Sequence, residues 1–493
     1  MSFHHHEDWL TRLLNGWFGS AGRGGAPETV AWDWVLAVLI GICGMILAVR
    51  KSSWVVDYTV FVFVFNRGLR RMVDYYFHGE FTPFNPISLT PLVVASSMLI
   101  PVVFSLWRIP LRSRVVLLVL SAAIGYAFLI GFFRVRLAAV YALAESLAPL
   151  GLFAFVLVKQ PVAATKDRWM RAFGWAAILA SGYGWYQYLT IPPWDAMWLV
   201  ETKMVGYMGL PRPMQMTVFS TMAERGPLAA FLGFAVVPMI VSKKWRPMAG
   251  WSWLTGWLGV ILVFSAILLT LSRGGLLFAV IGTGTYLLVN QGRGARQIAT
   301  AVLLVGAAGW WGMERIPNAE RVIKRFESLT EIQEDQSYKG RVMVMSGGMD
   351  TIARSPLGLG LGAVGLATRV NTGSLSMAKN TVVDGGYFNV VLTYGVPGTL
   401  LLFAALVLAW GLLQHRFKRK TMLDDHVLLG RAMMITLIPA CFAGDLLTGF
   451  SIFWLALGCG VALPLMPGMR GGMRQPVALR RTTTALDSVH NAL

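Results

Sequence analysis

The chain has 493 residues, of which 56% are hydrophobic and only 14% are charged. A soluble globular domain carries about 25% charged residues, so this composition excludes a soluble enzyme and favours a polytopic membrane protein. Lys and Arg number 43 against 24 Asp and Glu, a net charge of +19. In a membrane protein such an excess is typical of cytoplasmic loops, and we expect no nucleic-acid partner.

Long apolar runs predict an all-α polytopic membrane protein with about 12 to 14 transmembrane helices, since a span needs about 20 residues. Strands are not expected, because a backbone surrounded by hydrocarbon must satisfy its own hydrogen bonds. The predicted spans are 31–49, 53–66, 89–107, 114–133, 137–158, 170–189, 227–242, 253–270, 274–290, 298–312, 386–412, 428–445 and 449–466.

Hydropathy also divides the chain into a short N-terminal segment with an interfacial helix, a transmembrane bundle, a large polar loop with amphipathic helices, further spans and a basic tail. The N-terminal segment covers 1–30, and the transmembrane bundle covers 31–312 with an external loop at 190–226. The large polar loop covers 313–385, the further spans 386–466 and the basic tail 467–493. A loop of more than 70 residues with amphipathic pieces is uncommon unless it has a function.

Orientation follows from four short basic loops, which are separated from one another by even numbers of predicted spans. They lie near 159–171, 243–246, 293–296 and 416–420. The positive-inside rule makes their common face cytoplasmic. The tail at 467–493 returns to that face, and the two long polar loops lie together on the opposite face.

Aromatic and glycine-rich motifs follow one another between the spans. They are Tyr183–Tyr188 (YGWYQY), Pro192–Asp195 (PPWD), Val218–Thr221 (VFST), Gly226–Ala229 (GPLA), Ser272–Gly275 (SRGG), Arg325–Glu327 (RFE), Ser337–Tyr338, Gly340–Arg341, Ser355–Gly358 (SPLG) and Val383–Tyr387 (VDGGY). In this order they resemble the O-antigen ligase and Wzy-type polymerase superfamily over roughly 170–410. No single motif is specific; their order carries the resemblance.

The resemblance implies a GT-C-like, metal-independent glycosyltransferase without a cofactor, in the bacterial inner membrane with its active site facing the periplasm. Such enzymes take a glycan from undecaprenyl diphosphate. The implied partners are lipid-linked donor and acceptor glycans, membrane lipids, a chain-length regulator and a flippase. The acceptor distinguishes two activities: a polymerase uses a second undecaprenyl-linked glycan, whereas a ligase uses lipid A-core.

The Val383–Tyr387 motif resembles exopolysaccharide repeat-unit polymerases more than ligases. Ligases typically present a His-Asn pair nearby, where this chain has Lys379-Asn380. A lipid-linked oligosaccharide transporter is a further alternative. It would be expected to show inverted repeats and broken, charged helices at the membrane midplane, and the sequence shows little of either.

Departure of a diphosphate requires fixed cations in an enzyme without a metal, and the planar guanidinium of arginine binds phosphate through two hydrogen bonds. Arg273 interrupts an apolar stretch and is followed by two glycines; a snorkelling arginine in a tight turn is the alternative. Arg341 opens an expected helix, and an ordinary exposed charge is its alternative. Relatives often carry Arg directly before the VFST element; here Thr217 stands there and Arg212 is the nearest upstream arginine.

Asp384 is the candidate general base for the acceptor hydroxyl, with a helix N-cap as the alternative role. Family position adds Tyr338 and Tyr387 as substrate-binding candidates. Gly358 and Gly360 join them, because glycines permit backbone turns and close approach to a ligand.

Overall fold

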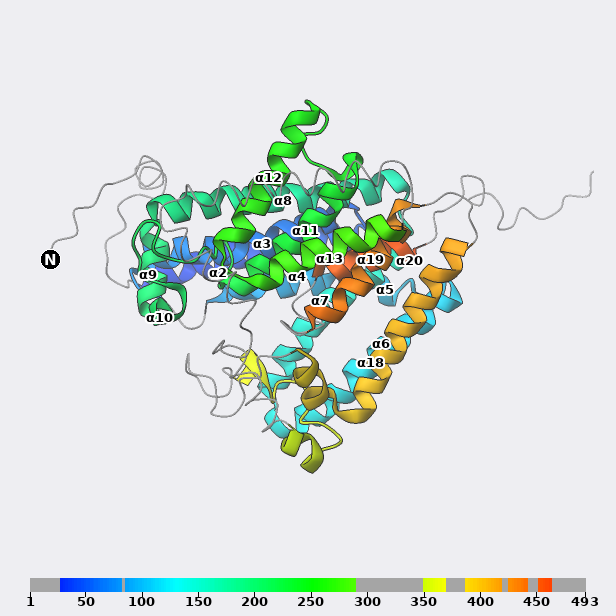
Figure 1. Ribbon diagram of the computed structural model, residues 1–493. Coiled ribbons are helices and arrows are strands. Elements are labelled where there is room, and N and C mark those ends of the chain that lie inside the picture. The colour runs from blue at the N-terminus through cyan, green and yellow to red at the C-terminus, as the bar shows by residue number, and fades with distance from the viewer. Residues whose placement is uncertain are drawn as a thin grey trace, which may run out of the picture.

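The computed structural model describes residues 27–81, 85–289, 349–368, 386–418, 424–441 and 451–462. Within these ranges the regular structure is helical, and an isolated β-bridge joins Gly209 and Met216. The prediction of an all-α polytopic membrane protein is confirmed for this part of the chain (Figure 1).

The helices follow one another along the chain, joined mostly by short turns. They are α2 (Pro27–Val49), α3 (Trp54–Val73), η1 (Asp74–His78), η2 (Pro86–Leu89), α4 (Thr90–Ser97), α5 (Leu99–Val103), η3 (Leu106–Arg108), α6 (Leu111–Val135), α7 (Leu137–Lys159), α8 (Ala163–Thr190), α9 (Pro193–Glu201), α10 (Val205–Met208), α11 (Arg225–Val241), η4 (Lys243–Trp245), α12 (Trp253–Leu269), α13 (Arg273–Val289), η6 (Gly365–Thr368), α18 (Gly386–Lys418), α19 (Asp425–Ala440) and α20 (Ser451–Val461).

Five described segments are long and apolar enough to cross a membrane, and shorter apolar helices accompany them. The five are Trp32–Val49, Pro86–Val103, Leu111–Val135, Leu137–Lys159 and Gly386–His415. The span predicted at 53–66 is part of α3, which continues to Val73. The span predicted at 298–312 lies outside the described residues, so the total of about 12 to 14 stays a prediction.

Helices α11 and α13 pack closely because glycines face each other between them. A Cβ atom added to Gly233 would lie 2.3 Å from the carbonyl oxygen of Gly275, and one added to Gly275 would lie 2.5 Å from that of Ala229. Small residues let helix backbones approach in this way inside membranes. The contacts 229–275 and 237–282 show that the two helices run parallel, so their first turns lie side by side.

Polar contacts gather one set of helix ends. Lys244 Nζ lies 2.9 Å from Asp425 Oδ2, and His426 Nε2 lies 2.9 Å from Asp167 Oδ1. The buried Lys166 Nζ donates to the carbonyl oxygen of Cys459 at 2.7 Å. The start of α8, η4, the start of α19 and the end of α20 therefore share one end of the bundle. That this end faces the cytoplasm stays a prediction.

Candidate active site

A buried ion pair stands at the opposite end of the bundle, between α3 and α9. Arg71 Nε lies 2.8 Å from Asp195 Oδ1, and the two side chains are 2% and 0% exposed. Arg71 also donates to the carbonyl oxygens of Ser220 and Met222, and its guanidinium carbon lies 4.8 Å from the centroid of the Phe219 ring. Burial raises the pKa of Asp195, and the positive charge of Arg71 opposes that rise.

Two side chains of α8 extend this pair into a network. Asp195 Oδ2 accepts hydrogen bonds from Tyr183 Oη at 2.8 Å and from Gln187 Nε2 at 2.6 Å. Gln187 Oε1 in turn accepts from the backbone N–H groups of Phe219 at 3.1 Å and Ser220 at 2.8 Å. The YGWYQY, PPWD and VFST motifs, which are separate in the sequence, therefore form one hydrogen-bonded unit.

This network fixes the turn at residues 218–222, where Ser220 adopts a φ of +52°. A left-handed φ at a non-glycine residue is unfavourable, so the surrounding bonds must hold it. Ser220 Oγ donates to the carbonyl oxygen of Ala180 at 2.6 Å, and Val218 N–H donates to the carbonyl oxygen of Leu269 at 3.2 Å. The second bond ties the turn to the end of α12, directly before Arg273.

Arg273 is the first residue of α13 and is partly buried. Leu271 has a φ of +52°, and Ser272 N–H donates to Thr270 Oγ1 at 3.2 Å, so the backbone reverses sharply before α13 begins. Close packing between Gly275 and Ala229 sets the first turn of α13 beside the first turn of α11. Arg225 opens that neighbouring turn, with its guanidinium 4.2 Å from the centroid of the Tyr207 ring. Two arginines therefore begin adjacent helices at the end that holds the buried pair.

Gly358 and Gly360 lie elsewhere, in a segment of residues 356–362 between α6 and α18, which we call the glycine strip. Leu359 N–H donates to the carbonyl oxygen of Leu392 at 2.7 Å, and Gly360 N–H donates to that of Thr393 at 3.0 Å. A Cβ atom on Gly360 would lie 2.1 Å from the backbone nitrogen of Gly131. The close approach that these glycines permit is thus with neighbouring helices, and their role in substrate binding stays a prediction.

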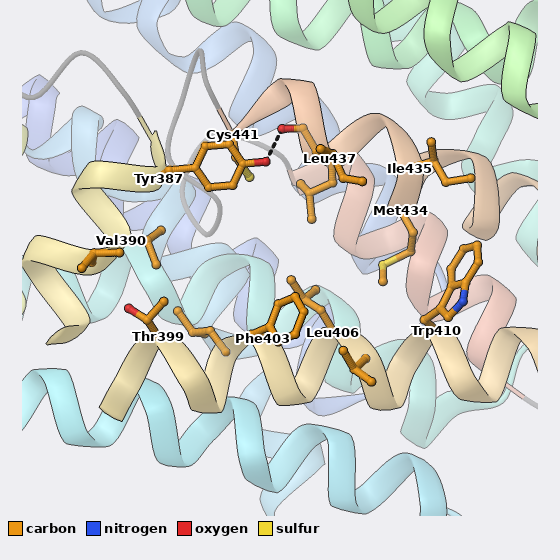
Figure 2. A pocket seen from close by; sticks show the side chains of 14 residues that line it. Tyr387, Val390, Thr399, Phe403, Leu406, Trp410, Met434, Ile435, Leu437 and Cys441 are labelled. Atoms are coloured by element: carbon orange, nitrogen blue, oxygen red, sulfur yellow. Dashed lines mark hydrogen bonds between the residues drawn. The ribbon is translucent and has the colours of Figure 1, made fainter. Parts of the chain in front are cut away.

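Tyr387 lies in the first turn of α18. Its N–H donates to the carbonyl oxygen of Cys441 at 3.1 Å, and its hydroxyl donates to that of Ile438 (Figure 2). Arg212 lies at the tip of an exposed turn closed by the Gly209–Met216 bridge. Arg212 thus lies between α10 and α11 and Tyr387 at the start of α18, whereas Arg273 begins α13. The remaining predicted site residues, Arg341, Asp384 and Tyr338, lie outside the described residues.

Sequence reasoning missed two arginines that the fold places at important positions. The sequence places Arg71 in an external loop, either contacting a glycan or on a solvated interfacial helix, whereas it is almost fully buried in the network around Asp195. Arg134, near the end of α6, donates to the carbonyl oxygen of Gly358 at 3.1 Å and so holds the glycine strip. The only signal in the sequence is that each of these two arginines stands close to aromatic residues. Their hydrogen-bond partners are too distant in the sequence to be inferred from it.

The described residues contain no group of three or more His, Cys, Asp or Glu side chains that could hold a metal ion. What the site offers instead is a rigid turn, held by buried charges, beside a helix that begins with arginine. A rigid turn of this kind can hold a neighbouring guanidinium in position to bind a ligand phosphate, so that the protein need not rearrange when charge develops on that phosphate.

Comparison with known proteins gives a family match that includes Arg273 but begins after the residues of the buried network. Residues 258–403 match the sequence model of the family described as O-Antigen ligase. The matched region begins within α12 and includes Arg273, the glycine strip and the kinked part of α18. A search of curated proteins finds no match. Residues 258–403 therefore match the O-antigen ligase family, which confirms the resemblance to the O-antigen ligase and Wzy-type superfamily for this part of the chain.

Proposed function

We propose that this membrane protein polymerises undecaprenyl-diphosphate-linked oligosaccharide repeat units into exopolysaccharide or O-antigen at the periplasmic face of the inner membrane. The family region supports a glycan-joining membrane enzyme in general. The observation that carries the proposal is the position of Arg273, which begins α13 beside a turn fixed by the buried Arg71–Asp195 pair. A guanidinium held at a helix end is suited to a leaving diphosphate.

In the proposed reaction, an acceptor hydroxyl attacks the anomeric carbon of the donor glycan. The bond from that carbon to the diphosphate oxygen breaks, and undecaprenyl diphosphate leaves with the bonding electrons. Asp384 takes the hydroxyl proton, while Arg273 and Arg341 stabilise the charge that develops on the diphosphate. No metal is needed if the two guanidinium groups supply that stabilisation.

Arg212, Tyr338 and Tyr387 contact substrate in this proposal. Gly358 and Gly360 act indirectly in this proposal. The glycine strip that contains them sets the distance between α6 and α18 on the side of the loop predicted at 313–385.

The acceptor decides between polymerase and ligase. We favour a polymerase because Lys379-Asn380 stands where ligases usually present His-Asn, and because Val383–Tyr387 follows it. The description of the matched family favours the second candidate, an O-antigen ligase that transfers glycan to lipid A-core.

The test uses the purified chain in liposomes that contain only the lipid-linked repeat unit. A ladder of polymer supports the proposal. Product that forms only after lipid A-core is added, or a completed chain that is merely moved onto that core, would establish the ligase.

Variants then test the assigned residues. Arg273→Ala is expected to abolish elongation, and Arg273→Lys to restore little, because an ammonium cannot present two parallel N–H donors. Asp384→Asn should lower the rate by about 10²–10⁴-fold, the usual contribution of a general base. Arg112→Ala is the matched control, since Arg112 is exposed at the start of α6, at the end of the bundle that holds Lys244. Full activity in Arg273→Ala would remove that residue from the site.

A further inference from the structure

A groove lies between α18 and α19, with a cavity volume of about 410 Å³. It runs from Tyr387 and Cys441 at one end to Trp410 and Met434 at the other, as Figure 2 shows. Its lining is almost wholly apolar, and its polar groups are the hydroxyls of Tyr387 and Thr399, the indole N–H of Trp410 and the thiol of Cys441. The residues that line it are Tyr387, Val390, Val391, Thr399, Leu402, Phe403, Leu406, Val407, Trp410, Met434, Ile435, Leu437, Ile438 and Cys441.

The path of α18 creates this groove. Gly395 interrupts the helix with φ 62° and ψ −175°, a conformation that strongly favours glycine. Before the break, Tyr387 is bonded to Cys441 at the end of α19. After it, α18 runs beside α6 (Figure 1), and its far end returns to the bundle, where Leu413 packs against Gly430 of α19 and Gly460 of α20. Phe403, Val407 and Ile438 on the groove are 65%, 51% and 61% exposed. In a bilayer such a surface meets lipid chains.

A cation marks one end of the groove. Arg431 lies on α19 one turn before Met434 and Ile435, towards the end that holds Asp425. Its guanidinium carbon is 4.1 Å from the centroid of the Phe417 ring and 5.5 Å from that of Trp410. Trp410 also lines the groove, so this ring joins the apolar cavity to the charge.

The hydrogen-bonding capacity of Arg431 is not met within the described part of the chain. Its Nε and Nη1 atoms are buried and have no hydrogen-bond partner there. The carboxylates at the start of the same helix serve other groups: Asp425 pairs with Lys244 at 2.9 Å, and Asp424 caps the helix through the N–H of His426. Buried N–H groups of a charged side chain are costly to leave unsatisfied, which points to an anionic ligand.

We propose that the groove holds an acyl chain of an anionic glycerophospholipid, with the lipid phosphate bound by Arg431. The apolar cavity suits the chain, and the guanidinium suits the phosphate. The lipid would come from the leaflet at the Lys244 end, which is cytoplasmic under the positive-inside rule. The phosphate end of this site lies at the opposite end of the groove from Tyr387, and the proposal does not depend on the proposed glycan transfer.

The first test needs only the wild-type chain. Purified protein in detergent is titrated with phosphatidylglycerol or with diacylglycerol of the same chains, which lacks the phosphate, and bound lipid is counted by native mass spectrometry. We expect one tightly held phosphatidylglycerol and at least about tenfold weaker binding of diacylglycerol, since diacylglycerol offers Arg431 no phosphate to bind. Equal binding of the two lipids would overturn the proposal.

Variants locate the lipid. Arg431→Gln should weaken phosphatidylglycerol binding about tenfold or more, and Arg431→Lys should weaken it less. Leu406→Trp should fill the groove and reduce binding although Arg431 remains. Arg112→Gln, at an exposed arginine on the same end of the bundle, should leave binding unchanged. Undiminished binding in Arg431→Gln or in Leu406→Trp would refute the site.

A polyprenyl phosphate serves as the competing probe. Its displacement of phosphatidylglycerol, with binding insensitive to Arg431→Gln, would show that the groove takes an isoprenoid chain from the Tyr387 end instead.

Discussion

Replacing Gly360 with alanine should loosen the contact between the glycine strip and α6. Gly360 has a φ of +88°, and an added Cβ atom would lie 2.1 Å from the nitrogen and 2.4 Å from the Cα atom of Gly131. A left-handed backbone costs a non-glycine residue about 1–2 kcal/mol. Overpacking against backbone adds about 1–3 kcal/mol. The expected loss of stability is therefore about 2–5 kcal/mol.

Gly365→Ala provides the matched control, because Gly365 has a similar φ of +76° but no atom within 4 Å of its Cβ position. Only the backbone cost of about 1–2 kcal/mol should apply there. Both purified variants are heated in the same detergent, and their unfolding is monitored by size-exclusion chromatography. The two melting temperatures are then compared. We expect the melting temperature to fall about twice as far or more in Gly360→Ala. Equal losses would show that the strip is not clamped against α6.

Arg71→Met should leave Asp195 as an uncompensated buried charge and cost about 3–5 kcal/mol. Adding Asp195→Asn should recover much of this loss in the same thermal assay, whereas additive losses would contradict a coupled pair. Lys166→Met removes the donor to carbonyl groups at the end of α20 and should cost about 1–3 kcal/mol, also measured thermally; an unchanged melting temperature would argue against that bond. In single-cysteine labelling, Met204→Cys should react in intact cells and Lys244→Cys only after permeabilisation. The reverse pattern would invert the topology.

Much of the fold is predictable from sequence because apolar length alone defines a membrane helix. The spans expected at 114–133 and 137–158 match α6 and α7 within a few residues. The 53–66 segment is harder, since the basic residues of its last turns lower its hydropathy although α3 continues through them to Val73.

The site is less predictable, because its geometry depends on contacts between distant residues. The position of Arg273 at the start of a helix agrees with the span predicted at 274–290, which begins directly after it. By contrast, the partners of Arg71 lie 124 to 151 positions further along the chain, and hydropathy carries no information about such pairing. The glycine strip has the expected turns, but only the fold reveals that α6 and α18 occupy the space beside them.

The buried Arg71–Asp195 contact also constrains the order in which the chain can assemble. Arg71 is synthesised long before Asp195 and the carbonyl groups of Ser220 and Met222 that complete its surroundings. Until residue 222 has been synthesised, Arg71 of α3 must therefore be hydrated or form temporary hydrogen bonds with other groups. The first half of the protein can fold around Arg71 before α12 and α13 are synthesised. Arg273 would then pack beside a turn at residues 218–222 that has already formed.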